Sequence, residues 1–493
     1  MQNRVSICLA LAAAAGLLLA WLQPDSYQQD AGHHFVAARW AWAHPESFVT
    51  VWNRPLFTFL YSFPAQLSYP IAKLFTLAIA LLTAHQTYRL AQQLRIERAW
   101  LAIPLIFLQP SFFMISADTM TEPLFALLFV IALRLHTAGR NVAGMIVASL
   151  LVTVRPEGFF LAVLWAAWVL KDVPRSPFHV PRSVPGTQNE QRERGTRNEE
   201  RGTIAPTATV LFLSTGAFLW WLSALFLTGD PLFILHSWPG NWDLDATYGR
   251  GTVWIYLLRL PEIAGLVLLV PFVAGLFVSL KRREYGSLTS SYLTLFIVHT
   301  ILRVSGWFGS AGYARYFVCI SPAIAILTLV GWNWFGARFA AASWRPAVAR
   351  ATLAFSAIVC IVYADMAGFY GRDARAVTEL HAWFQENPRP ITKFVWSQAY
   401  MNVLFDRDPS ERPVLLEDTA RNIEQLRQMP SGTLVFWDAD TGPAWYHVTA
   451  DDIVSAGYTL LYSKSYELDG WLKEGRWTPM PPRRERFYLL YKD

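Results

Sequence analysis

The chain has 493 residues, of which 54% are hydrophobic, 15% aromatic and 16% charged. Soluble globular proteins carry about 25% charged residues, so this composition excludes a single soluble enzyme. The net charge of +6 does not indicate nucleic-acid binding, because the basic residues flank apolar runs and form no dedicated patch. The charges are also uneven: they are concentrated in 171–203 and in 365–493 and are scarce elsewhere.

Apolar runs long enough to cross roughly 30 Å of hydrocarbon recur through the first part of the chain, up to position 364. They lie near residues 5–22, 56–84, 99–115, 120–138, 205–228, 253–280, 287–306, 312–336 and 347–364. The run 141–170 is interrupted by Arg155-Pro156-Glu157-Gly158. Proline and glycine favour a break there, and an Arg and a Glu at the bilayer centre are costly, so we expect a tight hairpin.

The distribution of basic residues predicts the orientation. With the hairpin and a cytoplasmic N-terminus, nineteen Lys and Arg fall in inside loops and six in outside loops. The outside six are Arg39, Arg54, Arg155, Arg250, Arg303 and Arg315. The sequence therefore predicts a polytopic α-helical membrane protein of about eleven spans, occupying residues 1–364, with its C-terminal part outside.

Two polar regions interrupt or follow this membrane domain. Residues 171–204 contain a near-duplicated polar stretch that cannot bury a core, and we expect a disordered cytoplasmic insertion. Residues 365–493 alternate strand-like and helix-like runs and predict an external α/β domain. The expected strands are Thr392–Trp396, Pro413–Leu416, Thr433–Trp437, Thr459–Ser463 and Arg486–Tyr491, and the expected helices are Asp373–Gln385, Thr419–Gln428 and Ala450–Ala456.

Polar side chains on the predicted external face fall into four clusters. The first contains Asp25, Asp30, His33 and His34 and continues to Arg54; the others centre on Glu122, on Arg155 with Glu157, and on Arg315 with Tyr316. A carboxylate at a membrane interface suits general-base chemistry, and an outward-facing arginine suits a lipid-borne phosphate. The alternatives are helix capping for the acids, mutual pairing for Arg155 and Glu157, and snorkelling for Arg315.

Metal binding has no support in the sequence. Adjacent histidines on one element point in different directions, and no second pair of ligands has the spacing of a zinc site.

The first cluster resembles the acidic first-loop motif of the GT-C membrane glycosyltransferases, in Pro24-Asp25-Ser26-Tyr27-Gln28, Asp30 and His33/His34. It is most similar to the mannosyltransferase branch. Thr121-Glu122-Pro123-Leu124, Arg155-Pro156-Glu157-Gly158 and Gly312-Tyr313-Ala314-Arg315-Tyr316 are similar to later landmarks of bacterial members. The resemblance covers about residues 1–336. Ser26 stands where the mannosyltransferase pattern has a second acid, so both Asp25 and Asp30 stay candidates for the base.

The resemblance implies a transferase in the bacterial inner membrane that uses a polyprenyl-phosphate-linked sugar as donor, with mannose as the sugar of that branch. Asp25 or Asp30 would deprotonate the acceptor hydroxyl, with inversion at the anomeric carbon. Arg315, with Arg54 or Arg155, would stabilise the departing lipid phosphate. His34, Glu122, Glu157 and Tyr316 are the further candidate site residues. The acceptor stays open among a lipid, a glycan and a protein.

Two other functions fit a polytopic membrane protein. An envelope-glycan polymerase or ligase would not require the first-loop acids. A lipid or sugar transporter (flippase) would place ionisable residues at mid-membrane depth and often shows internal repeats. The apolar runs carry few charges, with Lys73 the clearest, and the two halves show no repeat.

Overall fold

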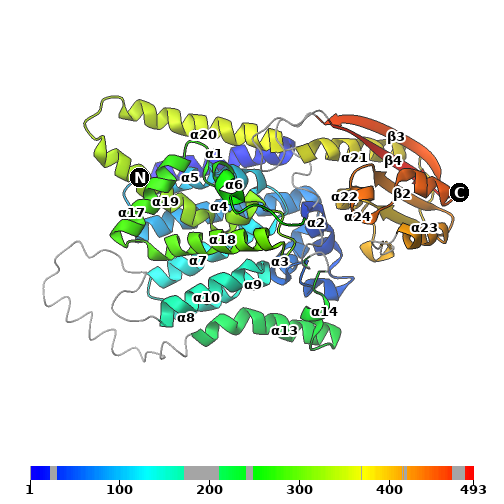
Figure 1. Ribbon diagram of the computed structural model, residues 1–493, viewed down its shortest axis with the longest axis horizontal. Helices are drawn as coiled ribbons and strands as arrows, with labels where there is room; N and C mark the ends of the chain where they lie inside the picture. The colour runs from blue at the N-terminus through cyan, green and yellow to red at the C-terminus, as the bar shows by residue number, and fades with distance from the viewer. Residues whose placement is uncertain are drawn as a thin grey trace.

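A computed structural model describes residues 2–22, 30–170, 210–239, 242, 248–367, 369–412, 415, 419–468 and 483–493. The chain forms a bundle of apolar helices with a small mixed sheet at one end (Figure 1). The helices of the bundle are α1 (Gln2–Leu22), α2 (Asp30–Trp40), α3 (Pro55–Ala65), α4 (Tyr69–Gln93), α5 (Ala102–Phe107), α6 (Pro110–Ile115), α7 (Thr121–Thr137), α8 (Asn141–Ser149), α9 (Leu151–Val154), α10 (Glu157–Leu170), α13 (Thr215–Thr228), α14 (Phe233–His236), α15 (Ile255–Leu258), α16 (Leu260–Ala264), α17 (Leu269–Arg282), α18 (Gly286–Ser305), the 3-10 segment η5 (Ala314–Ile320), α19 (Ser321–Arg338) and α20 (Arg345–Ala367).

The bundle has the surface of an integral membrane protein. Within the described residues, five helices are long and apolar enough to span a bilayer: Gln2–Leu22, Val210–Thr228, Gly286–Ser305, Ala314–Arg338 and Arg345–Ala364. Large apolar side chains on the outer helices are exposed, such as Leu11 on α1 and Phe226 on α13. Water would disfavour such a surface, whereas lipid does not, and helices satisfy their own backbone hydrogen bonds in the bilayer. The predicted fold class of helical membrane bundle and C-terminal α/β unit is confirmed.

The predicted run 56–84 is wrong as a single span. The structure divides it into α3 and α4, and α4 continues to Gln93. Pro64 lies in the last turn of α3, and the Ser68 side chain accepts a hydrogen bond from the Ile71 amide and so caps α4. A proline and a good N-cap residue four positions apart therefore end one helix and begin the next.

The predicted break at 155–158 is present. Arg155 is extended (φ −157°, ψ 147°) because the following Pro156 disfavours helical backbone, and α10 begins at Glu157. A Cβ atom on Gly158 would overlap the backbone of Leu151, so only glycine lets α10 pack this closely against α9. The break leaves Arg155 and Glu157 at the tip of a hairpin.

The C-terminal unit follows α20 directly. It contains α21 (Phe369–Glu386), β1 (Lys393–Trp396), α22 (Ala399–Phe405), the 3-10 turn η6 (Pro409–Glu411), α23 (Thr419–Arg427), β2 (Thr433–Asp438), α24 (Thr441–Tyr446), α25 (Ala450–Ser455), β3 (Thr459–Leu468) and β4 (Arg483–Tyr491). The strand order is β1-β2-β4-β3, with β1 and β2 parallel and the other pairs antiparallel. Four of the five predicted strands and all three predicted helices are present. The fifth strand, Pro413–Leu416, lies largely outside the described residues, as does the insertion 171–204.

Side chains of β2 alternate between two cores. Phe436 packs with the membrane-side core, which includes Val377 and Leu380 of α21, whereas Val435 packs with Leu426 of α23 and Ile453 of α25. Helices therefore cover both faces of the sheet.

Candidate active site

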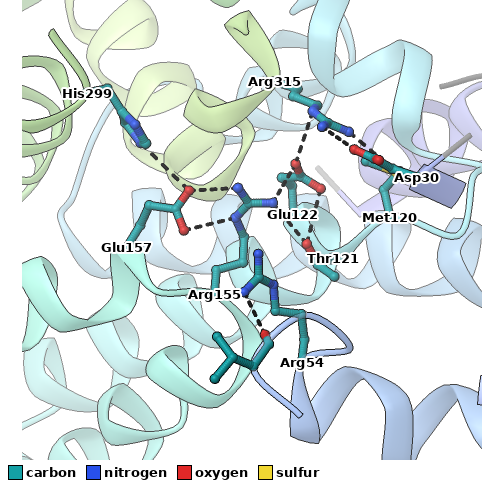
Figure 2. A network of polar contacts seen from close by, with 10 residues as sticks. Asp30, Arg54, Met120, Thr121, Glu122, Arg155, Glu157, His299 and Arg315 are labelled. Atoms are coloured by element: carbon teal, nitrogen blue, oxygen red, sulfur yellow. Dashed lines mark hydrogen bonds and ion pairs between the residues drawn. The ribbon is translucent and has the colours of Figure 1, made fainter. Parts of the chain in front are cut away.

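The four polar clusters predicted from the sequence lie together at one end of the bundle. Asp30 is the first residue of α2, Glu122 lies in the first turn of α7, Glu157 begins α10, and Arg315 lies in η5. Figure 2 shows their side chains directed toward one another from separate elements. Helix starts suit carboxylates because the helix dipole is positive there. The bundle therefore assembles residues that are up to 285 positions apart in the sequence.

The acids and arginines form a chain of alternating charge. Arg315 pairs with Asp30 at one end and lies 3.7 Å from Glu122 through its Nε. Arg155 Nη1 lies 2.7 Å from Glu122 Oε1, and Arg155 Nη2 lies 2.7 Å from Glu157 Oε1. All of these residues except Asp30 are buried. Buried charges persist only when they are paired, and each arginine here is balanced by two carboxylates.

Arg54 lies beside this chain of ion pairs but is not part of it. Its Nη1 donates to the Val51 carbonyl at 2.8 Å, and its guanidinium carbon lies 5.0 Å from the centre of the Trp242 ring. The Nε group is buried without a hydrogen-bond partner, and within the described residues Arg54 forms no ion pair with a carboxylate. Its backbone has φ 64°, a strained value for a non-glycine residue, and such strain tends to mark functional sites.

Aromatic side chains form one wall of the site. The Tyr316 ring stacks on His299, with ring centres 4.9 Å apart, and the Arg155 guanidinium carbon lies 5.6 Å from the Tyr316 ring centre. His299 Nε2 in turn lies 3.9 Å from Glu157 Oε1. His299 was not among the predicted site residues. An ionisable residue in the interior of the run 287–306, away from Arg303 near its end, was the signal that could have identified it.

Of the remaining predicted site residues, His34 lies within the described structure and Asp25 lies outside it. His34 is buried one helical turn after Asp30, and its ring centre lies 6.2 Å from that of Trp52. Burial lowers the pKa of His34 to about 3, so its imidazole is neutral near pH 7. Asp25 lies outside the described residues, so the choice between Asp25 and Asp30 stays open.

Asp30 is the most accessible of the three acids in the ion-pair chain. Its side chain is 23% exposed, and α2 lies outside the membrane-spanning segments. Burial is the largest single influence and raises the pKa of the Asp30 carboxyl, but the charge and hydrogen bond of Arg315, with smaller contributions from His34 and His33, together hold that pKa below its usual value. Asp30 is therefore a carboxylate at neutral pH, able to accept a proton.

A cavity of about 100 Å³ connects these groups. Its walls include Asp30, Arg54, Arg155, Glu157 and Arg315, together with the aromatic residues Trp52, Trp242, Tyr313 and Tyr316. Among the described residues, no group of three His, Cys, Asp or Glu side chains is arranged to hold a metal ion. The cavity thus offers carboxylates, guanidinium groups and aromatic faces to a ligand.

Comparison with known proteins shows similarity at the level of structure. No family model and no curated sequence matches the chain. The crystal structure of ArnT from Cupriavidus metallidurans bound to undecaprenyl phosphate matches with a TM-score of 0.58 and 12% identity, covering 99% of this chain and 98% of ArnT. The apo ArnT structure gives a TM-score of 0.57 over the same share. The mycobacterial arabinofuranosyltransferase AftD matches at a TM-score of 0.46 and 14% identity over 97% of this chain and 39% of its own.

The match to ArnT extends over both the helical bundle and the C-terminal unit, so it concerns the whole architecture. At 12% identity it establishes the fold and leaves the substrate to chemical argument. The chain therefore has the fold of ArnT.

Proposed function

We propose that this protein is a membrane glycosyltransferase that transfers a sugar from a polyprenyl-phosphate donor to an acceptor hydroxyl on the external face. Two facts support it together: the GT-C fold, shared with an ArnT that binds undecaprenyl phosphate, and a cavity in which carboxylates and arginines meet. Mannose is the sugar implied by the resemblance of the first loop to the mannosyltransferase branch, from whose pattern Ser26 departs.

The observation that carries the proposal is Arg54. Arg155 is held between the carboxylates of Glu122 and Glu157, whereas Arg54 keeps a buried Nε donor unused and lines the cavity. A guanidinium binds phosphate through charge-assisted hydrogen bonds. We assign Arg54 to the donor phosphate, with Arg315 at the other side of the cavity.

The chemistry then follows from where charge develops. The acceptor oxygen attacks the anomeric carbon as the bond from that carbon to the phosphate oxygen breaks, and the sugar configuration inverts. Asp30 takes the hydroxyl proton, and polyprenyl phosphate leaves with the bond's electron pair. Arg54 and Arg315 stabilise the negative charge on the leaving phosphate, which is the largest electrostatic demand of this step. Tyr316 and Trp242 provide faces on which a sugar ring can stack.

The test is transfer by purified full-length protein with undecaprenyl-phosphate sugars, starting with mannose, and a lipid and glycan extract as acceptor. Release of undecaprenyl phosphate is followed by mass spectrometry. We expect Asp30→Asn to lower kcat by roughly 10²- to 10⁴-fold and Arg54→Gln by roughly 10²-fold, the usual range for a general base and for a charge-stabilising donor.

The controls are exposed residues of the same type, Asp451→Asn on α25 and Arg140→Gln beside α8. Both should keep wild-type activity. Asp25→Asn is measured in parallel, since Asp25 is the other candidate base. Full activity in both acid variants would contradict the mechanism and favour a polymerase or ligase. Substrate flux into liposomes without release of undecaprenyl phosphate would favour a transporter.

A further inference from the structure

A second cavity, of about 660 Å³, lies among α17, α19 and the start of α20, and we call it the distal cavity. Figure 1 places these elements at the end of the bundle away from the C-terminal sheet. The distal cavity and the site cavity have no lining residue in common. It is therefore a separate feature that the proposed reaction does not use.

Two arginines meet at one end of the distal cavity. A Cβ atom on Gly336 would lie 2.8 Å from Arg345 Nη2 and 3.6 Å from Arg98 Nη1, so both guanidinium groups border the same backbone position. Neither arginine forms an ion pair with a carboxylate in the described part of the chain. Two cations held together without an acid between them form a binding site for an anion.

The distal cavity is elongated along the bundle. Two neighbouring residues, Leu108 and Gln109, show how α17 and α19 are aligned. Gln109 Nε2 donates to the Ser321 carbonyl at 3.0 Å, and a Cβ atom on Gly265 would lie 3.0 Å from the Leu108 carbonyl oxygen. The segment ahead of α17 is therefore level with the start of α19, and the two helices then pack along each other. The lining residue Val270 follows Gly265 closely, whereas Gly336 lies near the far end of α19. Since Gly265 is level with Ser321, Val270 is level with position 326 of α19. Position 326 is ten residues before Gly336, so about 15 Å of helix separates the two ends of the cavity.

The walls away from the arginines are apolar and open outward. Val270 is 59% exposed, Phe339 44% and Trp344 51%, so this side of the cavity faces the surface that meets lipid. Tryptophan beside basic residues is typical of a membrane–water interface. The shape therefore combines a cationic end at the interface with an apolar groove running into the bilayer.

We propose that the distal cavity binds an anionic phospholipid of the leaflet opposite the candidate active site. Its phosphate lies between Arg98 and Arg345, and an acyl chain follows the groove toward Val270. A neutral lipid would leave the two guanidinium groups uncompensated. A small soluble anion would leave the apolar groove empty. This site holds whether or not the protein transfers a sugar.

Binding is tested on the full-length protein by native mass spectrometry and in nanodiscs, with phosphatidylglycerol and phosphatidylcholine in equal amounts. We expect the wild type to retain phosphatidylglycerol at least tenfold over phosphatidylcholine. The double variant R98Q/R345Q should lose this preference. Arg350→Gln, an exposed arginine on the same helix as Arg345, is the matched control and should keep it.

A second measurement does not depend on the variants being folded. Phosphatidylglycerol with a photoreactive acyl chain is crosslinked to the wild-type protein, and the adducts should map to α17 and to residues 332–352. An unchanged lipid preference in R98Q/R345Q would overturn the proposal, as would crosslinks confined to other helices. Displacement of the lipid by millimolar inorganic phosphate would also overturn it, since it would show a site for a free anion.

Discussion

Asp30 illustrates how single residues set the chemistry of the site. Burial is the largest single influence and raises the pKa of its carboxyl, whereas the charge and hydrogen bond of Arg315, with smaller contributions from His34 and His33, lower it, and the net result is a lowered pKa. In the proposed mechanism Arg315 therefore has a second role besides stabilising the leaving phosphate: it keeps the candidate base ionised. A lowered pKa also makes Asp30 a weaker base. The transition state offsets this weakness, because the acceptor hydroxyl loses its proton as the new bond forms.

Removing Arg315 should shift the acidic limb of the pH–rate profile. In Arg315→Gln the charge and the hydrogen bond that chiefly oppose burial are lost, so the pKa of Asp30 rises, and the protonated acid cannot accept a proton. We expect kcat/KM to begin falling at a higher pH than in the wild type, with Arg315→Lys intermediate. The measurement is kcat/KM against pH for the three proteins. An acidic limb that does not move would show that Asp30 is not the base whose titration limits the rate.

The residues of the site were largely predictable, but their partners were not. Charge is scarce in the membrane body, so Glu122, Arg155 and Arg315 were identifiable from the sequence alone. The mutual pairing of Arg155 with Glu157, which was the structural alternative to a functional role, is present. However, the bridging position of Glu122 between Arg155 and Arg315 depends on how three helix ends meet, and local sequence carries no information about that contact.

Helix α2 couples the candidate site to the C-terminal unit. Asp30 and His34 line the cavity, whereas Gly32 faces α22, and a Cβ atom there would lie 3.0 Å from the Tyr400 amide nitrogen. An ion pair between Arg39 and Asp406, at 2.7 Å, lies at the same interface. The C-terminal unit is thus packed against the helix that carries the candidate base. Sequence patterns predicted its strands because alternation is local, but they could not predict this docking.

The close contact at Gly32 should matter more than the ion pair. Gly32→Val places atoms against the α22 backbone, and overpacking of this kind costs about 1–3 kcal/mol. We expect a lower Tm, faster hydrogen exchange in residues 393–412 and at least a tenfold loss of transfer activity. Asp406→Asn removes only an exposed ion pair, of about 0–1 kcal/mol, and should leave all three nearly unchanged. Equal effects of the two variants would contradict a tight α2–α22 contact.

At the scale of the whole molecule, α20 relates the two ends of the bundle. It begins at Arg345 beside the distal cavity, and its 23 residues extend about 34 Å, enough to cross a hydrocarbon core of about 30 Å before the chain enters the C-terminal unit. We therefore expect the candidate site and the distal cavity to lie on opposite faces of the membrane. The distribution of basic residues predicts which face is which: the distal cavity should be cytoplasmic and the C-terminal unit external.

Cysteine labelling tests this orientation directly. The native cysteines Cys319 and Cys360 are buried and Cys8 is partly buried, so they give a low background with a membrane-impermeant maleimide. Asp451→Cys on α25 and Arg350→Cys near the start of α20 introduce exposed thiols at the two ends. In intact spheroplasts we expect the thiol at 451 to react and the thiol at 350 to react only after permeabilisation. The opposite pattern would place the cavity containing Asp30 and Arg54 on the cytoplasmic face, and donor sugars would then have to be supplied from the cytoplasmic leaflet.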